Sequence, residues 1–275
     1  MYSAKDAGRN GYRFFDAAMT QAADERLRME ADLRRALKGG EFVLHFQPKI
    51  ESATRRLLGF EALIRWQQAD GSLIPPVRFI PLAEETGLIG AIGEWALHTA
   101  CQTLRRWRDE GLCNLSMSVN VSARQLRNPD LPQQVQRALE NSGVPSARLE
   151  MEITESVAME DPERTVETLR ALKAIGIGVS IDDFGTGYSS LAYLKLLPIN
   201  CLKLDRTFVT DIETDPNDAA ICAATIRLAH TLGLSVVAEG VETAEQARYL
   251  DSLDCDVMQG YYFSRPLPEA QARAF

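Results

Sequence analysis

From Glu41 onward, the chain alternates between short apolar runs and longer segments in which apolar residues recur every three or four positions. Runs of the first kind predict strands, and segments of the second kind predict helices. The predicted strands are Phe42–Gln47, Leu57–Ile64, Leu115–Val121, Arg148–Ile153, Gly178–Asp182, Cys201–Leu204, Ser235–Ala238 and Cys255–Met258. The predicted helices include Ile92–Glu110, Pro129–Asn141, Pro162–Ile175, Pro216–Leu232 and Ala244–Leu250. Eight strand-then-helix units without an internal break predict an α/β fold, a (β/α)₈ TIM-like barrel.

An open, doubly wound sheet is the alternative arrangement for such units. That fold would more naturally carry a glycine-rich phosphate loop after its first strand, and this chain has none there. The comparable stretch at Gly185–Tyr188 follows the fifth predicted strand and lacks the spacing of a nucleotide-binding fingerprint. These observations favour the barrel.

The first 40 residues follow a different pattern. Met19–Lys38 predicts one helix that carries charges of both signs and only a thin apolar stripe, and Gly39–Gly40 ends it. We interpret residues 19–40 as a connector helix and residues 41–275 as the barrel domain.

The composition is that of a packed globular protein, with 45% hydrophobic and 25% charged residues among 275. The net charge of −8 has the wrong sign for a protein that grips a nucleic-acid polymer through its phosphates. No apolar run approaches the roughly 20 residues that span a bilayer, and the N-terminus has no signal-peptide pattern. We therefore expect a cytoplasmic location and no membrane contact by this segment, although further N-terminal segments of a longer protein could attach it to a membrane.

Cysteine and histidine leave little material for other chemistry. The five cysteines include no C-x-x-C pair and lie mostly in apolar segments, so buried, reduced thiols are expected. The three histidines are too few to favour a histidine-built zinc site or a histidine-based nucleophile relay. Carboxylates must therefore carry any metal chemistry.

Polar residues mark the C-terminal ends of successive predicted strands. They are Glu61, Asn120, Glu152, Asp182, Asp183, Lys203, Asp205, Glu239 and Gln259. In a barrel these ends meet at one mouth, where barrel enzymes keep their catalytic groups. Each residue alone has an ordinary explanation, such as a solvated strand end or a turn residue. Their recurrence at consecutive strand ends predicts a functional site.

The carboxylates in such a mouth could not all stay ionised, because like charges raise each other's pKa. Bound cations would resolve this conflict, and oxygen ligands select hard ions such as Mg²⁺, Mn²⁺ or Ca²⁺. Asp182 and Asp183 cannot both point inward from a regular strand, so the chain must curl there, which Gly185 and Gly187 would help. Lys203 would orient a water or neutralise charge rather than remove a proton.

A series of ordered motifs contains these residues. They are Gln47-Pro48, Gly59–Trp66 with Glu61-Ala62-Leu63 inside it, Ser118–Ser122, Glu152–Ser156, Asp182–Leu191, Leu202–Asp205, Ala238–Thr243 and Gln259–Tyr261. Through their order and spacing, the chain resembles the EAL domain, the cyclic di-GMP phosphodiesterase of bacterial signalling. The resemblance runs from about residue 30 to the C-terminus.

The resemblance implies a barrel with one antiparallel strand and a centre of two Mg²⁺ or Mn²⁺ ions. It implies that this centre hydrolyses cyclic di-GMP to linear pGpG. The mechanism would be in-line attack by a metal-bridging hydroxide on one phosphodiester. The ions, rather than basic side chains, would then attract a dianionic substrate to an acidic protein.

The resemblance also implies roles for individual residues. The ligands of the first ion would be Glu61, Asn120, Glu152 and Asp182, and those of the second would be Asp182, Asp183 and Glu239. Lys203 matches the water-orienting lysine, and Glu155 matches the glutamate that holds the Asp182–Asp183 loop. Supporting roles around the ions and the water fall to Glu242, Asp205 and Gln259. Contacts with the ligand fall to Gln47, Arg65 and Gln259.

Two positions depart from the family pattern. Asn200 stands where the family usually has Asp, and Lys49 stands where an apolar residue is common. Neither position is assigned to a metal. Residues 1–15 resemble the end of a GGDEF domain, so we interpret residues 1–18 as the tail of an upstream GGDEF domain in a longer protein. The apolar stretch Tyr188–Leu197 would allow a homodimer.

Two other functions are compatible with parts of this pattern. One is a catalytically silent receptor that only binds cyclic di-GMP, and the other is an unrelated barrel hydrolase acting on a different phosphodiester. A silent member would be expected to lack a metal ligand, Lys203 or Glu155, and this chain has all of them. The motif order argues against an unrelated hydrolase, so an active phosphodiesterase is favoured.

Overall fold

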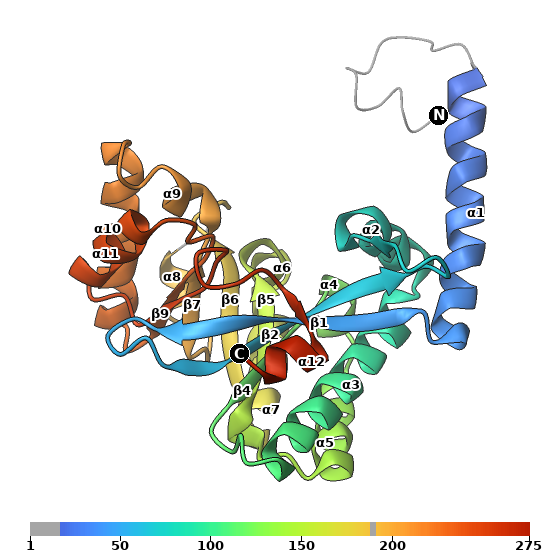
Figure 1. Ribbon diagram of the computed structural model, residues 1–275, viewed down its shortest axis with the longest axis horizontal. Coiled ribbons are helices and arrows are strands. Elements are labelled where there is room, and N and C mark those ends of the chain that lie inside the picture. The colour runs from blue at the N-terminus through green and yellow to red at the C-terminus, as the bar shows by residue number, and fades with distance from the viewer. Residues whose placement is uncertain (1–16, 188–190) are drawn as a thin grey trace.

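In the computed structural model, which describes residues 17–187 and 191–275, the strands close into a barrel with helices around it (Figure 1). The barrel strands are β1 (Phe42–Glu51), β2 (Leu57–Gln67), β4 (Ser116–Asn120), β5 (Leu149–Thr154), β6 (Gly178–Phe184), β7 (Cys201–Leu204), β8 (Ser235–Ala238) and β9 (Val257–Met258). Two short strands, β3 (Leu73–Ile74) and β10 (Leu267–Pro268), flank the sheet. The helices are α1 (Ala17–Gly39), α2 (Pro76–Thr86), α3 (Ile89–Asp109), α4 (Ala123–Leu126), α5 (Leu131–Ser142), α6 (Glu155–Glu160), α7 (Pro162–Ile175), α8 (Leu191–Leu194), α9 (Arg206–Thr210), α10 (Pro216–Thr231), α11 (Ala244–Ser252) and α12 (Glu269–Arg273), with a 3₁₀ turn, η2, at Ser146–Arg148.

Strand β1 closes the barrel and runs against its neighbours. It pairs antiparallel with β2 on one side and with β9 on the other. From β2 through β4 to β9, each barrel strand pairs in parallel with the next. The predicted TIM-like barrel with one antiparallel strand is therefore confirmed.

The first predicted strand-then-helix unit is wrong, because residues 52–56 alone join β1 to β2. So short a connection cannot bring the chain back for parallel pairing, and the two strands form an antiparallel hairpin. In its register, Gln47 lies opposite Glu61 and Lys49 lies opposite Gly59. The hairpin therefore aligns part of the candidate site.

The other predicted elements are present with their ends shifted by a few residues. Helix α7 begins at Pro162, and the Asp161 side chain caps it by accepting a hydrogen bond from the backbone N–H of Arg164. Helix α11 begins with a capping box formed by Thr243 and Gln246. The starts of these helices could be predicted because their stabilising contacts are local in sequence.

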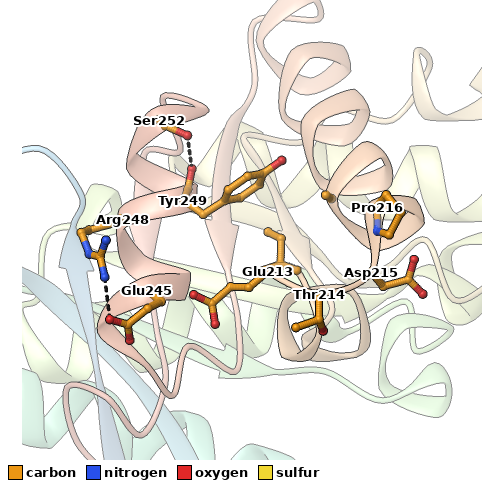
Figure 2. Close-up of a pocket in the computed structure, with 10 residues that line it drawn as sticks. Glu213, Thr214, Asp215, Pro216, Glu245, Arg248, Tyr249 and Ser252 are labelled. Carbon is orange, nitrogen blue, oxygen red and sulfur yellow. Dashed lines mark hydrogen bonds and ion pairs between the residues drawn. The ribbon is translucent and has the colours of Figure 1, made fainter.

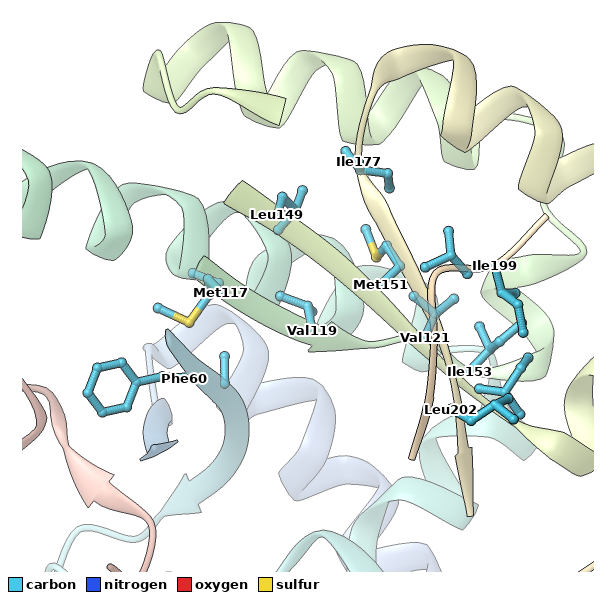
Figure 3. Packing of buried hydrophobic residues seen from close by; sticks show 14 of the residues in the cluster. Phe60, Met117, Val119, Val121, Leu149, Met151, Ile153, Ile177, Ile199 and Leu202 are labelled. Atoms are coloured by element: carbon cyan, nitrogen blue, oxygen red, sulfur yellow. The ribbon is translucent and has the colours of Figure 1, made fainter. Parts of the chain in front are cut away.

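The main apolar core lies between the outside of the barrel and the helices. Figure 3 shows Met117 and Val119 of β4 and Leu149 and Met151 of β5 within it, and none is more than 3% exposed. Burying one such side chain contributes about 1.5–3 kcal/mol. Because strand side chains alternate between faces, the residues between these, such as Ser118, point into the barrel. The same alternation therefore builds the core outside and a polar interior inside.

Helix α1 is packed against the domain through its C-terminal half. Leu33 and Ala36 are 0% exposed and belong to a second apolar cluster with Trp66 of β2 and Phe79 of α2. Closer to the N-terminus, Leu27 is 66% exposed, and Figure 1 shows this part of α1 extending away from the barrel. The predicted helix is confirmed, and its last turns are part of the folded domain.

None of the five cysteines forms a disulfide. Four of the five are buried, and burial raises the pKa of each of their thiols to about 12: Cys101, Cys201, Cys222 and Cys255. Cys113 is exposed. Among the helices of the described residues, none combines the length and the apolar character that crossing a membrane requires.

Candidate metal centre

The carboxyl ends of the barrel strands meet at one mouth, and most of the predicted polar side chains lie in or beneath it. A cleft of about 240 Å³ opens there. It is lined by Gln47, Glu61, Leu63, Asp182, Arg206, Glu239, Gly240, Glu242, Gln259, Gly260 and Tyr261. Glu152 and Lys203 are 0% exposed beneath it, and Nζ of Lys203 contacts both Glu152 and the cleft carboxylates Asp182 and Glu239.

Lys203 is the centre of the cluster. Its Nζ lies 2.6 Å from Glu152, 2.7 Å from Glu239, 3.1 Å from Asp182 and 3.7 Å from Glu61. Burial opposes the charged form of this lysine, but the surrounding carboxylates outweigh burial and raise its pKa well above the usual value. Lys203 therefore remains a protonated ammonium, which donates hydrogen bonds but cannot act as a general base.

The pKa values of the carboxylates in this cluster shift in opposite directions. Burial raises the pKa of Glu61 and Asp182, and it raises that of Glu239 to about 8. For Glu152, burial acts in the same direction but Lys203 and Lys49 outweigh it, so its pKa falls to about 2. One ammonium thus cannot keep all of its carboxylate neighbours ionised, and further cations would complete the charge balance.

Two groups of three carboxylates are arranged closely enough to hold metal ions. One consists of Glu61, Glu152 and Asp182, and the other consists of Asp182, Asp183 and Glu239. Within each group the ligand atoms lie within 4.8 Å of one another. Asp182 belongs to both, which is the arrangement that a bridging ligand needs. The donors are oxygens only, so the residues fit hard divalent cations.

The expected curl at Asp182–Asp183 is present. The pairing of β6 with β7 shifts register between Ile181 and Phe184, and Asp183 has a φ of 54° in the left-handed region. The backbone N–H of Asp183 donates to Oδ1 of Asp182 at 2.9 Å. This β-bulge breaks the alternation of faces and lets adjacent carboxylates serve one site.

Glu155 supports the loop that follows the bulge. It is the first residue of α6 and only 2% exposed, and its Oε2 accepts a hydrogen bond from the backbone N–H of Gly185 at 2.7 Å. A Cβ at Gly187 would lie 2.9 Å from Oε1 of the same carboxylate. The structure thus places Glu155 against the loop that carries Asp183.

A chain of amides fixes the orientation of Glu61. Nδ2 of Asn120 donates to its Oε1 at 2.7 Å, and Nε2 of Gln259 donates to its Oε2 at 2.7 Å. Nε2 of Gln259 also donates to Oε1 of Gln47 at 3.1 Å. Because Asn120 uses its amide N–H, its carbonyl oxygen remains available to a cation.

Three further predicted residues lie at the edge of the cluster. Asp205 caps α9 by accepting a hydrogen bond from the backbone N–H of Thr207 at 2.8 Å, and burial together with Asp205 raises the pKa of Asp183. Glu242 is exposed on the wall of the cleft. Arg65 is half-buried beside the mouth, donates to the carbonyl of Ile64 at 2.8 Å, and has its pKa lowered by burial.

Sequence reasoning missed Lys49 and Arg206. Lys49 was noted only as a departure from the family pattern, yet it is 4% exposed and lies 3.3 Å from Glu152. Its position two residues after Gln47 on the same strand was the available signal, since such residues share a face. Arg206 lines the cleft directly after Asp205 and brings a positive charge to it.

A larger cleft, of about 540 Å³, lies elsewhere, between the start of α10 and α11 (Figure 2). Its lining includes Glu213, Asp215 and Glu245, and its Arg248 is paired with Glu245 at 2.5 Å. None of the predicted site residues lines it. The barrel mouth, where those residues gather, is therefore the better candidate site.

Two proteins with cyclic di-GMP phosphodiesterase in their names are similar to this chain over its whole length. Cyclic di-GMP phosphodiesterase NbdA of Pseudomonas aeruginosa is 42% identical over 275 residues, which are 100% of this chain and 35% of NbdA. The bifunctional diguanylate cyclase/cyclic di-GMP phosphodiesterase MucR of the same species is 47% identical over 274 residues, which are 100% of this chain and 40% of MucR. The chain therefore spans less than half the length of these relatives.

A solved structure and a family model agree with these relatives. The structure of the PaMucR phosphodiesterase in complex with c-di-GMP has a TM-score of 0.86 and 45% identity, covering 89% of this chain and 99% of that one. The model of the EAL domain matches residues 30–266. By its motifs, its barrel and these matches, the chain belongs to the EAL domain family.

Proposed function

We propose that this chain hydrolyses cyclic di-GMP to linear pGpG in a metal-dependent reaction. The observation that carries the proposal is the pair of carboxylate groups that share Asp182 and surround the buried Lys203 at the barrel mouth. The names of MucR and NbdA as cyclic di-GMP phosphodiesterases, and the c-di-GMP in the PaMucR structure, support this substrate.

Two divalent cations, Mg²⁺ or Mn²⁺, would bind at these carboxylates. The first set of ligands is Glu61, Asn120, Glu152 and Asp182, and the second is Asp182, Asp183 and Glu239. When bound, such ions lower the pKa of a water and share the charge that develops on the phosphate. The raised pKa values of Glu61, Asp182 and Glu239 support this assignment, because a cation would restore their ionised form.

The chain's own side chains orient the reacting groups. Lys203 keeps its proton and donates hydrogen bonds to the attacking water and to the developing charge. Asn120 and Gln259 hold Glu61 at both of its oxygens, so this ligand keeps one orientation. Glu155 holds the backbone at Gly185 and so fixes the position of the loop after Asp183.

Substrate contacts come from the walls of the cleft. Gln47 and Gln259 lie beside Glu61, with Arg65 at the edge of the mouth. Arg206 adds a positive charge that favours a dianionic substrate in a protein with a net charge of −8. Glu242 and Asp205 flank the second carboxylate group as supporting residues.

The wider organisation of the protein is also part of the proposal. Residues 1–18 would belong to an upstream GGDEF domain, residues 19–40 would connect the two domains, and residues 41–275 would form the phosphodiesterase. A homodimer through residues 188–197 and a cytoplasmic location complete this picture, although residues 188–190 lie outside the described part of the chain.

The test is chromatography of the products after incubating the purified chain with cyclic di-GMP and Mg²⁺ or Mn²⁺. We expect pGpG to accumulate, and excess EDTA to stop its formation. Glu61→Gln and Lys203→Met should lose turnover with an unchanged circular dichroism spectrum, whereas Glu213→Gln, in the other cleft, should match the unmodified chain. Binding of cyclic di-GMP without product, with either ion, would instead indicate a silent receptor.

A further inference from the structure

A second lysine, Lys49, is buried inside the barrel beneath the metal centre. It lies on β1 two residues after Gln47 and is 4% exposed. Strand pairing places Gln47 opposite Glu61 but Lys49 opposite Gly59, which is two residues farther from the mouth along β2. Lys49 therefore belongs to the layer of side chains directly below the carboxylates.

The Lys49 ammonium contacts three side chains on β4 and β5, two strands that pair with each other. It donates a hydrogen bond to Oγ of Ser118, and it lies 3.3 Å from Oε1 of Glu152 and 3.4 Å from Oε1 of Glu150. Ser118 and Glu152 are both 0% exposed. Solvent therefore does not compete with Lys49 for the Glu152 carboxylate.

Glu152 is thus held at both of its oxygens by different lysines. Lys49 contacts Oε1 from the lower layer, and Lys203 contacts Oε2 at 2.6 Å. Lys203 also reaches the other carboxylates of the centre, so a divalent cation bound there competes with it for the same oxygens. Lys49 contacts Glu152 alone among the proposed ligands, and from outside the centre. Its hold on Glu152 can therefore persist when a cation binds.

We propose that Lys49 is a positioning residue for the metal centre. By holding Oε1 of Glu152 from below, it presents Oε2 of the same carboxylate to the cation. The inference rests on the proposed role of Glu152 as a metal ligand. Side chains that orient a metal ligand in this way typically account for about 10- to 100-fold in metal affinity or activity.

The sign of the effect separates positioning from simple electrostatics. Lys49 is a positive charge near a cation site, so its removal would tighten metal binding if charge alone mattered. Its charge is also largely balanced by Glu150, which would be left as an uncompensated anion and would attract the metal further. Loss of orientation at Glu152 instead predicts weaker binding.

The test is direct binding of Mn²⁺ to the whole chain without substrate, followed by the electron paramagnetic resonance signal of free Mn²⁺. We expect Lys49→Met to raise the apparent Kd for Mn²⁺ by about 10- to 100-fold. The double variant Lys49→Met/Glu150→Gln removes both charges and should bind as weakly. Glu150→Gln alone keeps the hold on Glu152 and should change the Kd far less. At saturating Mn²⁺, turnover of Lys49→Met should recover.

The possible results distinguish an error in the role of Lys49 from an error in the proposed metal centre. If Lys49→Met binds Mn²⁺ as tightly as the unmodified chain, or more tightly, Lys49 does not position Glu152, and the proposed function is unaffected. If the unmodified chain fails to bind Mn²⁺, or Glu152→Gln leaves the Kd unchanged, the proposed metal centre itself is wrong. If Lys49→Met does not fold, the double variant Lys49→Met/Glu150→Gln is the replacement test, since it does not leave Glu150 as an uncompensated anion. Unchanged Mn²⁺ affinity in the double variant would overturn the inference equally.

Discussion

Binding of metal ions should release about one proton per chain at pH 7, because Glu239 is mostly protonated before the ions bind. Burial raises the pKa of this carboxyl to about 8. A group with that pKa is about 90% protonated at pH 7, and a carboxylate must be ionised to coordinate a metal. Burial also raises the pKa of Glu61 and Asp182, so these residues can only add to the release. Glu152, with a pKa of about 2, contributes nothing.

The number of protons can be measured by titrating Mn²⁺ calorimetrically in two buffers that differ in their heat of ionisation. The difference in observed heat should correspond to about 0.9 protons or more at pH 7. At pH 9 the share from Glu239 should fall to about 0.1, which makes that pH an internal control. Apparent Mn²⁺ affinity should rise by up to about tenfold per pH unit below pH 8 and then level off.

The same shift predicts how the metal-free fold responds to pH. A carboxyl whose pKa is raised from 4.5 to about 8 on folding stabilises the fold below pH 4.5, and this contribution is lost as the pH rises through 8. Glu239→Gln should remove the share of the proton release that comes from Glu239, about 0.9 protons at pH 7, together with this pH dependence. Equal and negligible proton release at pH 7 and pH 9 would mean that Glu239 is already ionised without metal, and the charge balance derived for the cluster would be wrong.

Three further predictions concern other parts of the molecule. Leu33→Ala should lower the free energy of unfolding by about 2–5 kcal/mol in urea titrations, because this α1 side chain is 0% exposed, whereas Leu27→Ala, at 66% exposed, should stay within about 0.5 kcal/mol. Glu155→Ala leaves the Gly185 N–H without its acceptor, at a cost of about 1–3 kcal/mol, and should weaken Mn²⁺ binding through the loop; an unchanged Kd would separate Glu155 from the metal centre. Arg65→Ala should raise KM for cyclic di-GMP with little change in kcat; a fall in kcat alone would contradict a ground-state substrate contact.

The polar residues at the strand ends could be predicted from the sequence, because the alternation of faces along one strand is a local pattern. Apolar residues at alternate positions, such as Met117 and Val119 on β4 or Leu149 and Met151 on β5, decide which face packs against the helices. The residues between them must then face the barrel interior. The resemblance to a known family added the grouping of these residues into a metal centre.

The contacts beneath the strand ends could not be predicted, because they depend on strand register. Lys49 meets Glu152 only because β1 pairs with β2 so that Lys49 lies opposite Gly59, while β4 and β5 carry Ser118 and Glu150 into the same layer. No sequence motif in the chain indicates that register.

The hairpin and the connector helix differ in how much of their structure the sequence could indicate. Residues 52–56 are too few for a helix, so their number alone could have indicated a hairpin between β1 and β2. The thin apolar stripe of α1 gave a weaker signal, because its packing depends on partners from elsewhere. Leu33 is buried by side chains such as Trp66 and Phe79, which come from β2 and α2.

The ionisation of this acidic cluster follows from how many lysines each carboxylate contacts. Glu152 contacts Lys49 from β1 and Lys203 from β7, and it alone of the four acids around Lys203 has a lowered pKa. The other three share only Lys203, and their pKa values are raised: Glu61, Asp182 and Glu239. Within the described residues, the metal-free cluster therefore keeps one permanent anion beside its ammonium while the remaining acids can hold protons. Protons thus occupy the places that cations would take, which lowers the cost of burying these carboxylates together in the absence of metal.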